Sequence, residues 1–192
     1  MPATHRTHRI ASYHCAMLTP GDSQSLFDLF TGLPLHPLII HIVIVMLPLA
    51  ALAMIVVMVF PRLRKPYLPV ALGASVIATA SAYVAVKSGE ALQERVGWPG
   101  VHAELGDTVF PLTALFTLAS IGWAVTSRWK TTAAVWLSRV IAVAVVSLAI
   151  AAITFLVLAG HSGAKATWED RIGAPASIME ELPAVPGGIE NR

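Results

Sequence analysis

Residues 35–60 read LHPLIIHIVIVMLPLAALAMIVVMVF, an unbroken run without Asp, Glu, Lys or Arg. About 20 apolar residues, at roughly 1.5 Å per residue, cross a hydrocarbon core of about 30 Å. Backbone N–H and C=O groups inside lipid must be satisfied within their own segment, so a helix is the structure expected at this length. The stretch therefore predicts a membrane-spanning helix.

Three further stretches lack all four charged residue types and are long enough to span a membrane. They are Tyr67–Val86, Thr108–Ser127 and Val140–Gly160. Charged residues make up only 12% of the chain and hydrophobic residues 56%, whereas an ordinary soluble domain has roughly 25% charged residues. A water-soluble shell cannot be built from so few charges, so the lipid bilayer must cover much of the surface. We predict an all-α fold, an integral membrane four-helix up-and-down bundle.

The predicted organisation is one membrane domain between two tails. The domain covers residues 31–165, with helices at about 35–60, 67–87, 102–127 and 136–160. Residues 1–30 and 166–192 are expected to be flexible tails on composition. Residues 1–16 differ in composition from the rest of the chain. Met17 is therefore an alternative to Met1 as the true start of the protein.

The two connections expected at one end of the bundle are basic. Pro61–Pro66 and Ser127–Lys130, with Arg139 just before the last span, together carry six Lys or Arg and no acidic residue. The positive-inside bias places these turns in the cytoplasm. We therefore expect a multi-pass protein of the inner (cytoplasmic) cell membrane with both termini outside. A formal net charge of +2 is too small to suggest a nucleic-acid partner.

Four histidines fall at the opposite, outer membrane face of this topology. His36 and His41 begin the first helix, His102 begins the third, and His161 follows the fourth. His41 lies about 9 Å along its helix from Leu35, just inside the hydrocarbon edge. An ionisable group at that depth usually faces the bundle interior with a partner. Glu90, at the end of the second helix, reaches the same level, so each helix offers one potential ligand.

Several of these residues stand in motifs of a known family. The segment Gly32–Leu38 followed by His41 resembles the opening signature of the bacterial membrane family DUF2231. Ser88–Glu90, His102–Asp107 and Gly160–His161 fit its later motifs, and the resemblance covers about residues 30–165. It implies no established activity. Some members look fused or adjacent to Rieske-type iron–sulfur proteins, and this implies a role in electron transfer.

The first hypothesis for the site is a haem b held by two neutral imidazoles. In a four-helix bundle only diagonal helices leave room for iron with an imidazole on each side. The first and third helices are diagonal, and this nominates His41 and His102 as axial ligands, with His36 and His161 as supporting groups or substitutes. Gly106, one turn after His102, would leave room for the flat ring. A redox partner protein would then complete the electron-transfer role.

Two other hypotheses stay open. A divalent metal ion such as Zn, Cu or Fe could be bound by His41, His102, His161 and Glu90, because bundles build such sites from inward-facing His and carboxylate groups. Alternatively, the protein is a structural or assembly subunit without a cofactor. None of the three hypotheses implies a catalysed reaction, so the chain is expected to be an electron-transfer or binding protein rather than an enzyme.

Overall fold

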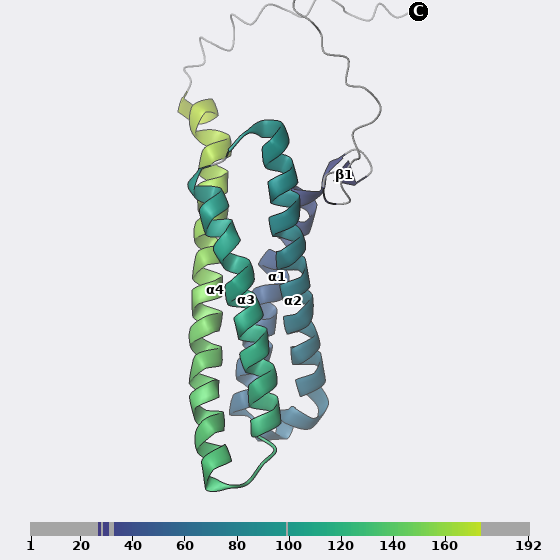
Figure 1. The fold of residues 1–192 in the computed structure, drawn as a ribbon, viewed down its shortest axis with the longest axis vertical. Helices are drawn as coiled ribbons and strands as arrows, with labels where there is room; N and C mark the ends of the chain where they lie inside the picture. The colour runs from purple at the N-terminus through teal and green to yellow at the C-terminus, as the bar shows by residue number, and fades with distance from the viewer. Residues whose placement is uncertain (1–26, 28, 31–32, 99, 174–192) are drawn as a thin grey trace, which may run out of the picture.

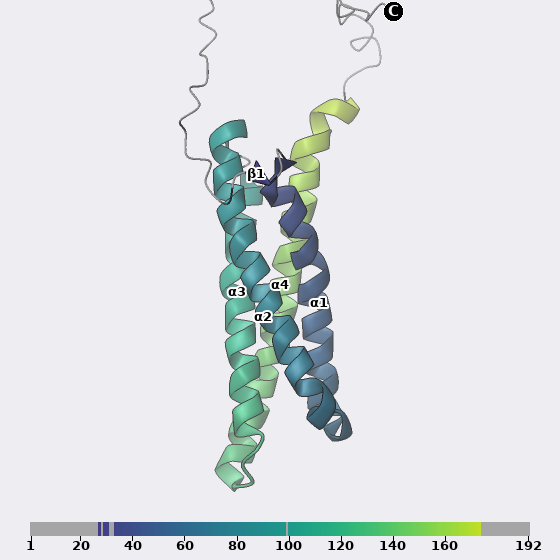
Figure 2. The same ribbon diagram turned by 90° about the vertical axis from the view of Figure 1, so that its right-hand side faces the viewer.

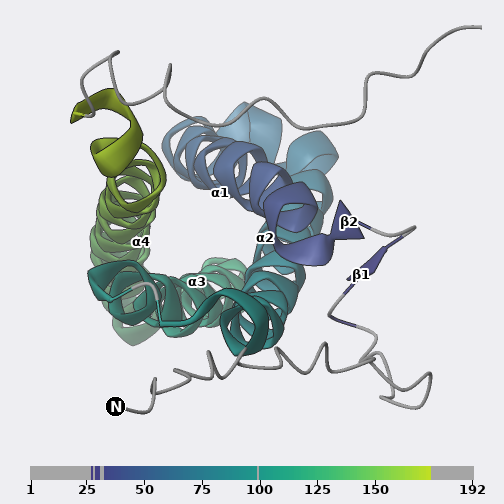
Figure 3. The same ribbon diagram turned by 90° about the horizontal axis from the view of Figure 1, so that it is seen from above.

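A computed structural model describes residues 27, 29–30, 33–98 and 100–173, which form four long helices (Figure 1). They are α1 (Leu35–Val59), α2 (Pro61–Val96), α3 (Val101–Thr126) and α4 (Thr132–Gly173). Successive helices run antiparallel and are arranged in a ring that closes between α4 and α1 (Figure 3). The predicted four-helix up-and-down bundle is confirmed, and α1 and α3 are diagonal within it.

All four helices are long and apolar enough to cross a membrane. Large apolar side chains remain exposed around the bundle, among them Leu49 at 53%, Leu118 at 64% and Val143 at 67%. Water would not tolerate so many exposed apolar groups, whereas lipid chains cover them without cost. The outer surface is therefore that of a membrane-embedded bundle.

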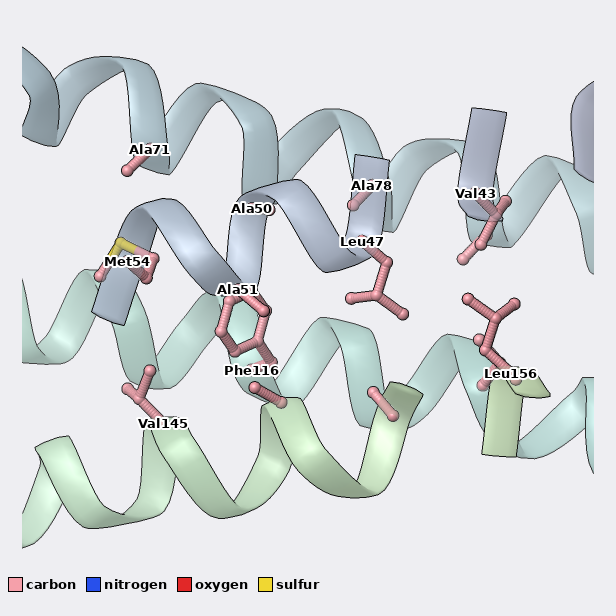
Figure 4. Packing of buried hydrophobic residues seen from close by; sticks show 14 of the residues in the cluster. Val43, Leu47, Ala50, Ala51, Met54, Ala71, Ala78, Phe116, Val145 and Leu156 are labelled. Carbon is pink, nitrogen blue, oxygen red and sulfur yellow. The ribbon is translucent and has the colours of Figure 1, made fainter. Parts of the chain in front are cut away.

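The core between the helices combines a few large side chains with many small ones. Leu47, Met54 and Phe116 are completely buried, and Val43 of α1 and Leu156 of α4 point toward each other (Figure 4). Small residues of α2, among them Ala71, Ala78 and Ala82, are buried as well. Small side chains let helix backbones approach closely, which is a main source of helix association in lipid.

A polar contact joins α2 to α3 in the middle of the bundle. The hydroxyl oxygens of Thr79 and Thr117 lie 2.8 Å apart, and Thr117 Oγ1 donates to the carbonyl of Ser75 at 3.1 Å. Every buried side-chain nitrogen or oxygen of the described residues has a hydrogen-bond partner. Such interhelical hydrogen bonds stabilise bundles in an apolar solvent.

The basic segment Pro61–Pro66, predicted to be a turn, is helical instead. Only Phe60, with extended backbone angles, separates α1 from α2, and Pro61 is the first residue of α2. Proline is well suited to that position, because the first turn of a helix leaves its N–H groups unpaired in any case and the fixed φ angle suits the helix. The turn is therefore much tighter than the proline-rich sequence suggested.

α4 is longer than the predicted span and continues to Gly173, so residues 166–173 of the predicted tail are helical. Its extension carries an ion pair one helical turn apart, with Lys165 Nζ 3.6 Å from Glu169 Oε1. Just before α1 in the sequence, β1 (Leu29–Phe30) and β2 (Leu33–Pro34) pair antiparallel, at the same end of the bundle as this extension (Figure 1). The rest of both tails, and the choice between Met1 and Met17, lies outside the described residues.

Candidate cofactor site

The histidines that open α1 and α3 meet at one end of the bundle, which we call the histidine end. His36 is the second residue of α1, and His102 is the second residue of α3. Their ring centroids lie 6.2 Å apart, with the ring planes at 81°. Because α1 and α3 are diagonal, the two rings approach each other across the axis of the bundle.

The His36 ring is fixed by the neighbouring helix α2. Its Nδ1 lies 2.8 Å from the carbonyl oxygen of Ala85, and a carbonyl can only accept a hydrogen bond, so Nδ1 is the donor. The buried Ser88 hydroxyl donates to the same carbonyl at 3.1 Å and lies 3.4 Å from Nδ1. The half-buried ring therefore has a defined orientation.

The His102 ring is fixed in the same way by α4. Its Nδ1 donates to the carbonyl oxygen of Ala159 at 2.8 Å. The Ser162 hydroxyl donates to that carbonyl as well, at 2.9 Å. Each histidine thus bonds to the partner helix of its own hairpin, α1–α2 or α3–α4.

A glycine makes room for each ring. A β-carbon at Gly89 would lie 3.2 Å from Nδ1 of His36, and one at Gly163 would lie 2.9 Å from Nδ1 and Cε1 of His102. The first distance is tight and the second is shorter than real β-carbon contacts allow. Both imidazoles therefore pack directly against the backbone of the adjacent helix.

These contacts reveal a repeat that the sequence analysis missed. Residues 85–89 read AVKSG and residues 159–163 read AGHSG, so both follow the pattern Ala-x-x-Ser-Gly. In each copy the alanine carbonyl accepts the imidazole N–H, the serine bonds to the same carbonyl, and the glycine clears space. The repeated pattern, paired with a histidine at the start of the preceding helix, is the signal that could have identified His36 and His102.

The hydrogen bonds also fix which ring nitrogen is available for chemistry. With the proton on Nδ1, the neutral imidazole carries its lone pair on Nε2. Neither Nε2 makes a hydrogen bond within the described part of the chain. A ring whose Nδ1–H is tied to a backbone carbonyl is the usual arrangement of a metal-binding histidine. Two such rings therefore present their acceptor nitrogens at the same end of the bundle.

His41, predicted to pair with His102, lies elsewhere on α1. It is exposed, and its Nδ1 donates to the carbonyl of Pro37 on its own helix at 2.6 Å. Five residues along a helix amount to a rotation of about 140°, so His41 and His36 cannot face the same direction. The depth argument favoured His41, whereas the rotation about the helix axis brings His36 to the bundle centre.

The remaining predicted residues lie around the pair. His161 is exposed, and the exposed Glu90 accepts hydrogen bonds from Lys87 Nζ at 2.7 and 2.9 Å. A β-carbon at Gly106 would meet no described atom within 4 Å, so there is free space one turn from His102. Among residues 33–98 and 100–173 no three His, Cys, Asp or Glu side chains are grouped to hold a metal ion. The set His41, His102, His161 and Glu90 is thus not brought together in this structure.

Fold and site together define a membrane-spanning four-helix bundle with an imidazole pair contributed by diagonal helices. The family model described as "Predicted membrane protein (DUF2231)" matches residues 32–176. The chain belongs to this family, as its motifs predicted, and the matched region includes all four helices and both paired histidines. Neither a curated protein nor a solved structure matches the chain.

Proposed function

We propose that His36 and His102 are the axial ligands of a b-type haem that serves electron transfer at one face of the membrane. The observation that carries this proposal is the diagonal imidazole pair, with each Nδ1–H bonded to a backbone carbonyl. This arrangement leaves both Nε2 lone pairs for a metal and holds the rings in place before it binds.

The spacing of the rings supports a single metal between them. Metal–imidazole bonds of about 2.0–2.1 Å would hold the two ring centroids about 6 Å apart if the ion lay in line between the two ring nitrogens. Iron–imidazole bonds are of similar length, and the observed centroid separation is 6.2 Å. The free space at Gly106 adjoins His102 on the same face of α3, as the haem hypothesis requires.

The number of ligands favours haem over a bare metal ion. A non-haem metal needs about four protein ligands or bound waters, and no third His, Cys, Asp or Glu joins the pair in the described residues. A porphyrin brings four nitrogen ligands of its own and needs only the two axial ones. Haem with both axial positions filled supplies one-electron transfer, and its potential would be set by ligation, burial and hydrogen bonding.

The charge distribution supports an outward-facing site. The basic segments at the opposite end carry six Lys or Arg residues and no acidic residue, and the positive-inside bias places such segments in the cytoplasm. The haem would then exchange electrons with a redox partner protein at the outer face of the inner membrane.

The test is to express the full chain under haem-replete conditions, purify it in mild detergent and record reduced-minus-oxidised spectra with metal analysis. The proposal expects sharp haem bands that are lost in His36→Ala and in His102→Ala. In sealed vesicles of known orientation, a membrane-impermeant reductant should reduce this haem only from the histidine end.

His41→Ala and His161→Ala are the matched controls, because they remove exposed imidazoles at the same end. Both variants should keep the spectrum. Haem that is lost in His41→Ala but kept in His36→Ala would instead support His41 and His102 as the ligands. Stoichiometric metal without haem would favour the non-haem site, and neither cofactor in the wild type would leave a structural role for the pair.

A further inference from the structure

A second site lies at the opposite end of the molecule, which we call the basic end because the Arg- and Lys-rich segments 61–66 and 127–130 both lie there. A cavity of about 330 Å³ lies between the end of the α1–α2 hairpin and the end of the α3–α4 hairpin. The two hairpins diverge toward this end (Figure 2). The lining comes from all four helices and the α3–α4 turn, and its polar and aromatic members are Arg64, Arg139, Ser127, Ser138, Trp123 and Trp129.

Arg64 is held rigidly at the cavity wall. Its Nε and Nη2 donate to the carbonyls of Val57 and Met58 at 3.1 and 2.8 Å, which satisfies the last turn of α1. Its guanidinium carbon lies 5.0 Å from the centre of the buried Trp123 ring, within range of a cation–π contact. A guanidinium has five N–H donors, so three remain after these two bonds. The charge is therefore fixed in place while donors are left for a ligand.

The rest of the lining favours an anion attached to an apolar body. Arg139 adds a second guanidinium, and every other lining residue is uncharged. Arginine is well suited to phosphate oxygens because its planar fork of donors matches them. Met58, Val135 and Ala142 are the apolar residues in the lining of the same cavity. Trp129 is exposed in the turn, where tryptophan typically lies at the level of lipid headgroups.

We propose that this cavity binds the phosphate group of an anionic phospholipid from the leaflet that the basic end faces. Basic pockets between membrane helices commonly bind anionic headgroups. The ligand chemistry is a phosphate held by Arg64 and Arg139, with the glycerol and upper acyl chain against the apolar lining residues. This site is independent of the histidine pair and of any cofactor there.

The experiment is native mass spectrometry of the detergent-purified full chain titrated with phosphatidylglycerol, phosphatidylcholine or inorganic phosphate. Phosphatidylglycerol should remain bound and should resist displacement by inorganic phosphate. The Arg139→Gln variant should weaken its binding about tenfold, the effect of losing one charge-assisted pair. Arg139 is exposed, so this variant should fold normally, whereas Arg64→Gln would also remove the bonds that end α1.

Arg128→Gln is the matched control, because Arg128 adjoins the lining residues Ser127 and Trp129 without lining the cavity. This variant loses the same charge and should bind phosphatidylglycerol within about twofold of the wild type. Equal weakening in both variants would show general attraction to a basic surface and would overturn the site. Equal retention of phosphatidylcholine, or binding of inorganic phosphate alone, would overturn the assignment to an anionic lipid.

Discussion

Each hairpin of the bundle holds its histidine by a carbonyl hydrogen bond and a glycine contact, but the glycine contact is closer in α3–α4 than in α1–α2. In α3–α4 the ring of His102 leaves no room for a β-carbon at Gly163, whose nearest distance would be 2.9 Å. In α1–α2 the corresponding distance from Gly89 to His36 is 3.2 Å, which a small shift of the ring can relieve. The comparison teaches that His102 is the fixed member of the pair and that His36 has room to adjust.

The largest effect that tests this difference is expected for Gly163→Ala. The added methyl group must displace the His102 ring and disturb its bond to Ala159, an overpacking cost of about 3 kcal/mol. The gain in helix propensity from Gly to Ala offsets about 1 kcal/mol of this cost, so we expect the free energy of unfolding to fall by about 2 kcal/mol. Thermal unfolding in detergent measures it. Gly160→Ala on the same helix is the control, because a β-carbon there meets no described atom within 4 Å. Similar values for the two variants would contradict the tight fit.

A smaller effect on the free energy of unfolding is expected at the contact between α2 and α3, which joins the two hairpins. Thr117→Val removes the hydroxyl that bonds to Thr79 and to the Ser75 carbonyl. Interhelical hydrogen bonds of this kind in membranes contribute about 0.6 kcal/mol on average, so the free energy of unfolding should fall by about that amount. Thr154→Val should have no measurable effect, because the exposed Thr154 bonds only within its own helix. A Thr117→Val variant as stable as the wild type would show that the Thr117 hydroxyl does not help to join the hairpins.

The smallest effect is expected for Gly89→Ala. The steric cost against His36 should be about 1 kcal/mol, at the low end for overpacking, and the gain in helix propensity from Gly to Ala is about the same size. The two terms nearly cancel, so the stability measured as for Gly163→Ala should change by less than about 0.5 kcal/mol. A loss as large as that of Gly163→Ala would mean that both histidines are equally fixed, and the comparison between hairpins would fail.

The fold was predictable from sequence because charge-free stretches of spanning length leave few alternatives in lipid. Which of His36 and His41 faces the bundle centre was not predictable from depth, since counting residues along a helix gives height but not direction. Direction became clear only from the Ala85 carbonyl and Gly89, which stand on another helix.

Two further features escaped prediction for a similar reason. The Pro61–Pro66 segment reads as a turn by composition, yet proline is compatible with the first turn of a helix, where α2 in fact begins. The cavity at the basic end depends on Arg64 reaching Trp123, residues that are remote in sequence and meet only because the hairpins lie side by side. Sequence periodicity carries no information on such encounters.

Each imidazole hydrogen-bonds only within its own hairpin, and this has a mechanical consequence. The α2–α3 edge carries the threonine bonds, whereas α1 and α4 make the sparsest contact of the neighbouring pairs. The two hairpins are therefore joined more firmly along α2–α3 than along α1–α4. Separating the two hairpins along α1–α4 would break apolar contacts and the contact between the two imidazole rings, yet it would leave both Nδ1–H bonds intact. A molecule that enters from the bilayer between α1 and α4 would therefore meet two imidazole rings whose Nδ1–H bonds are already formed.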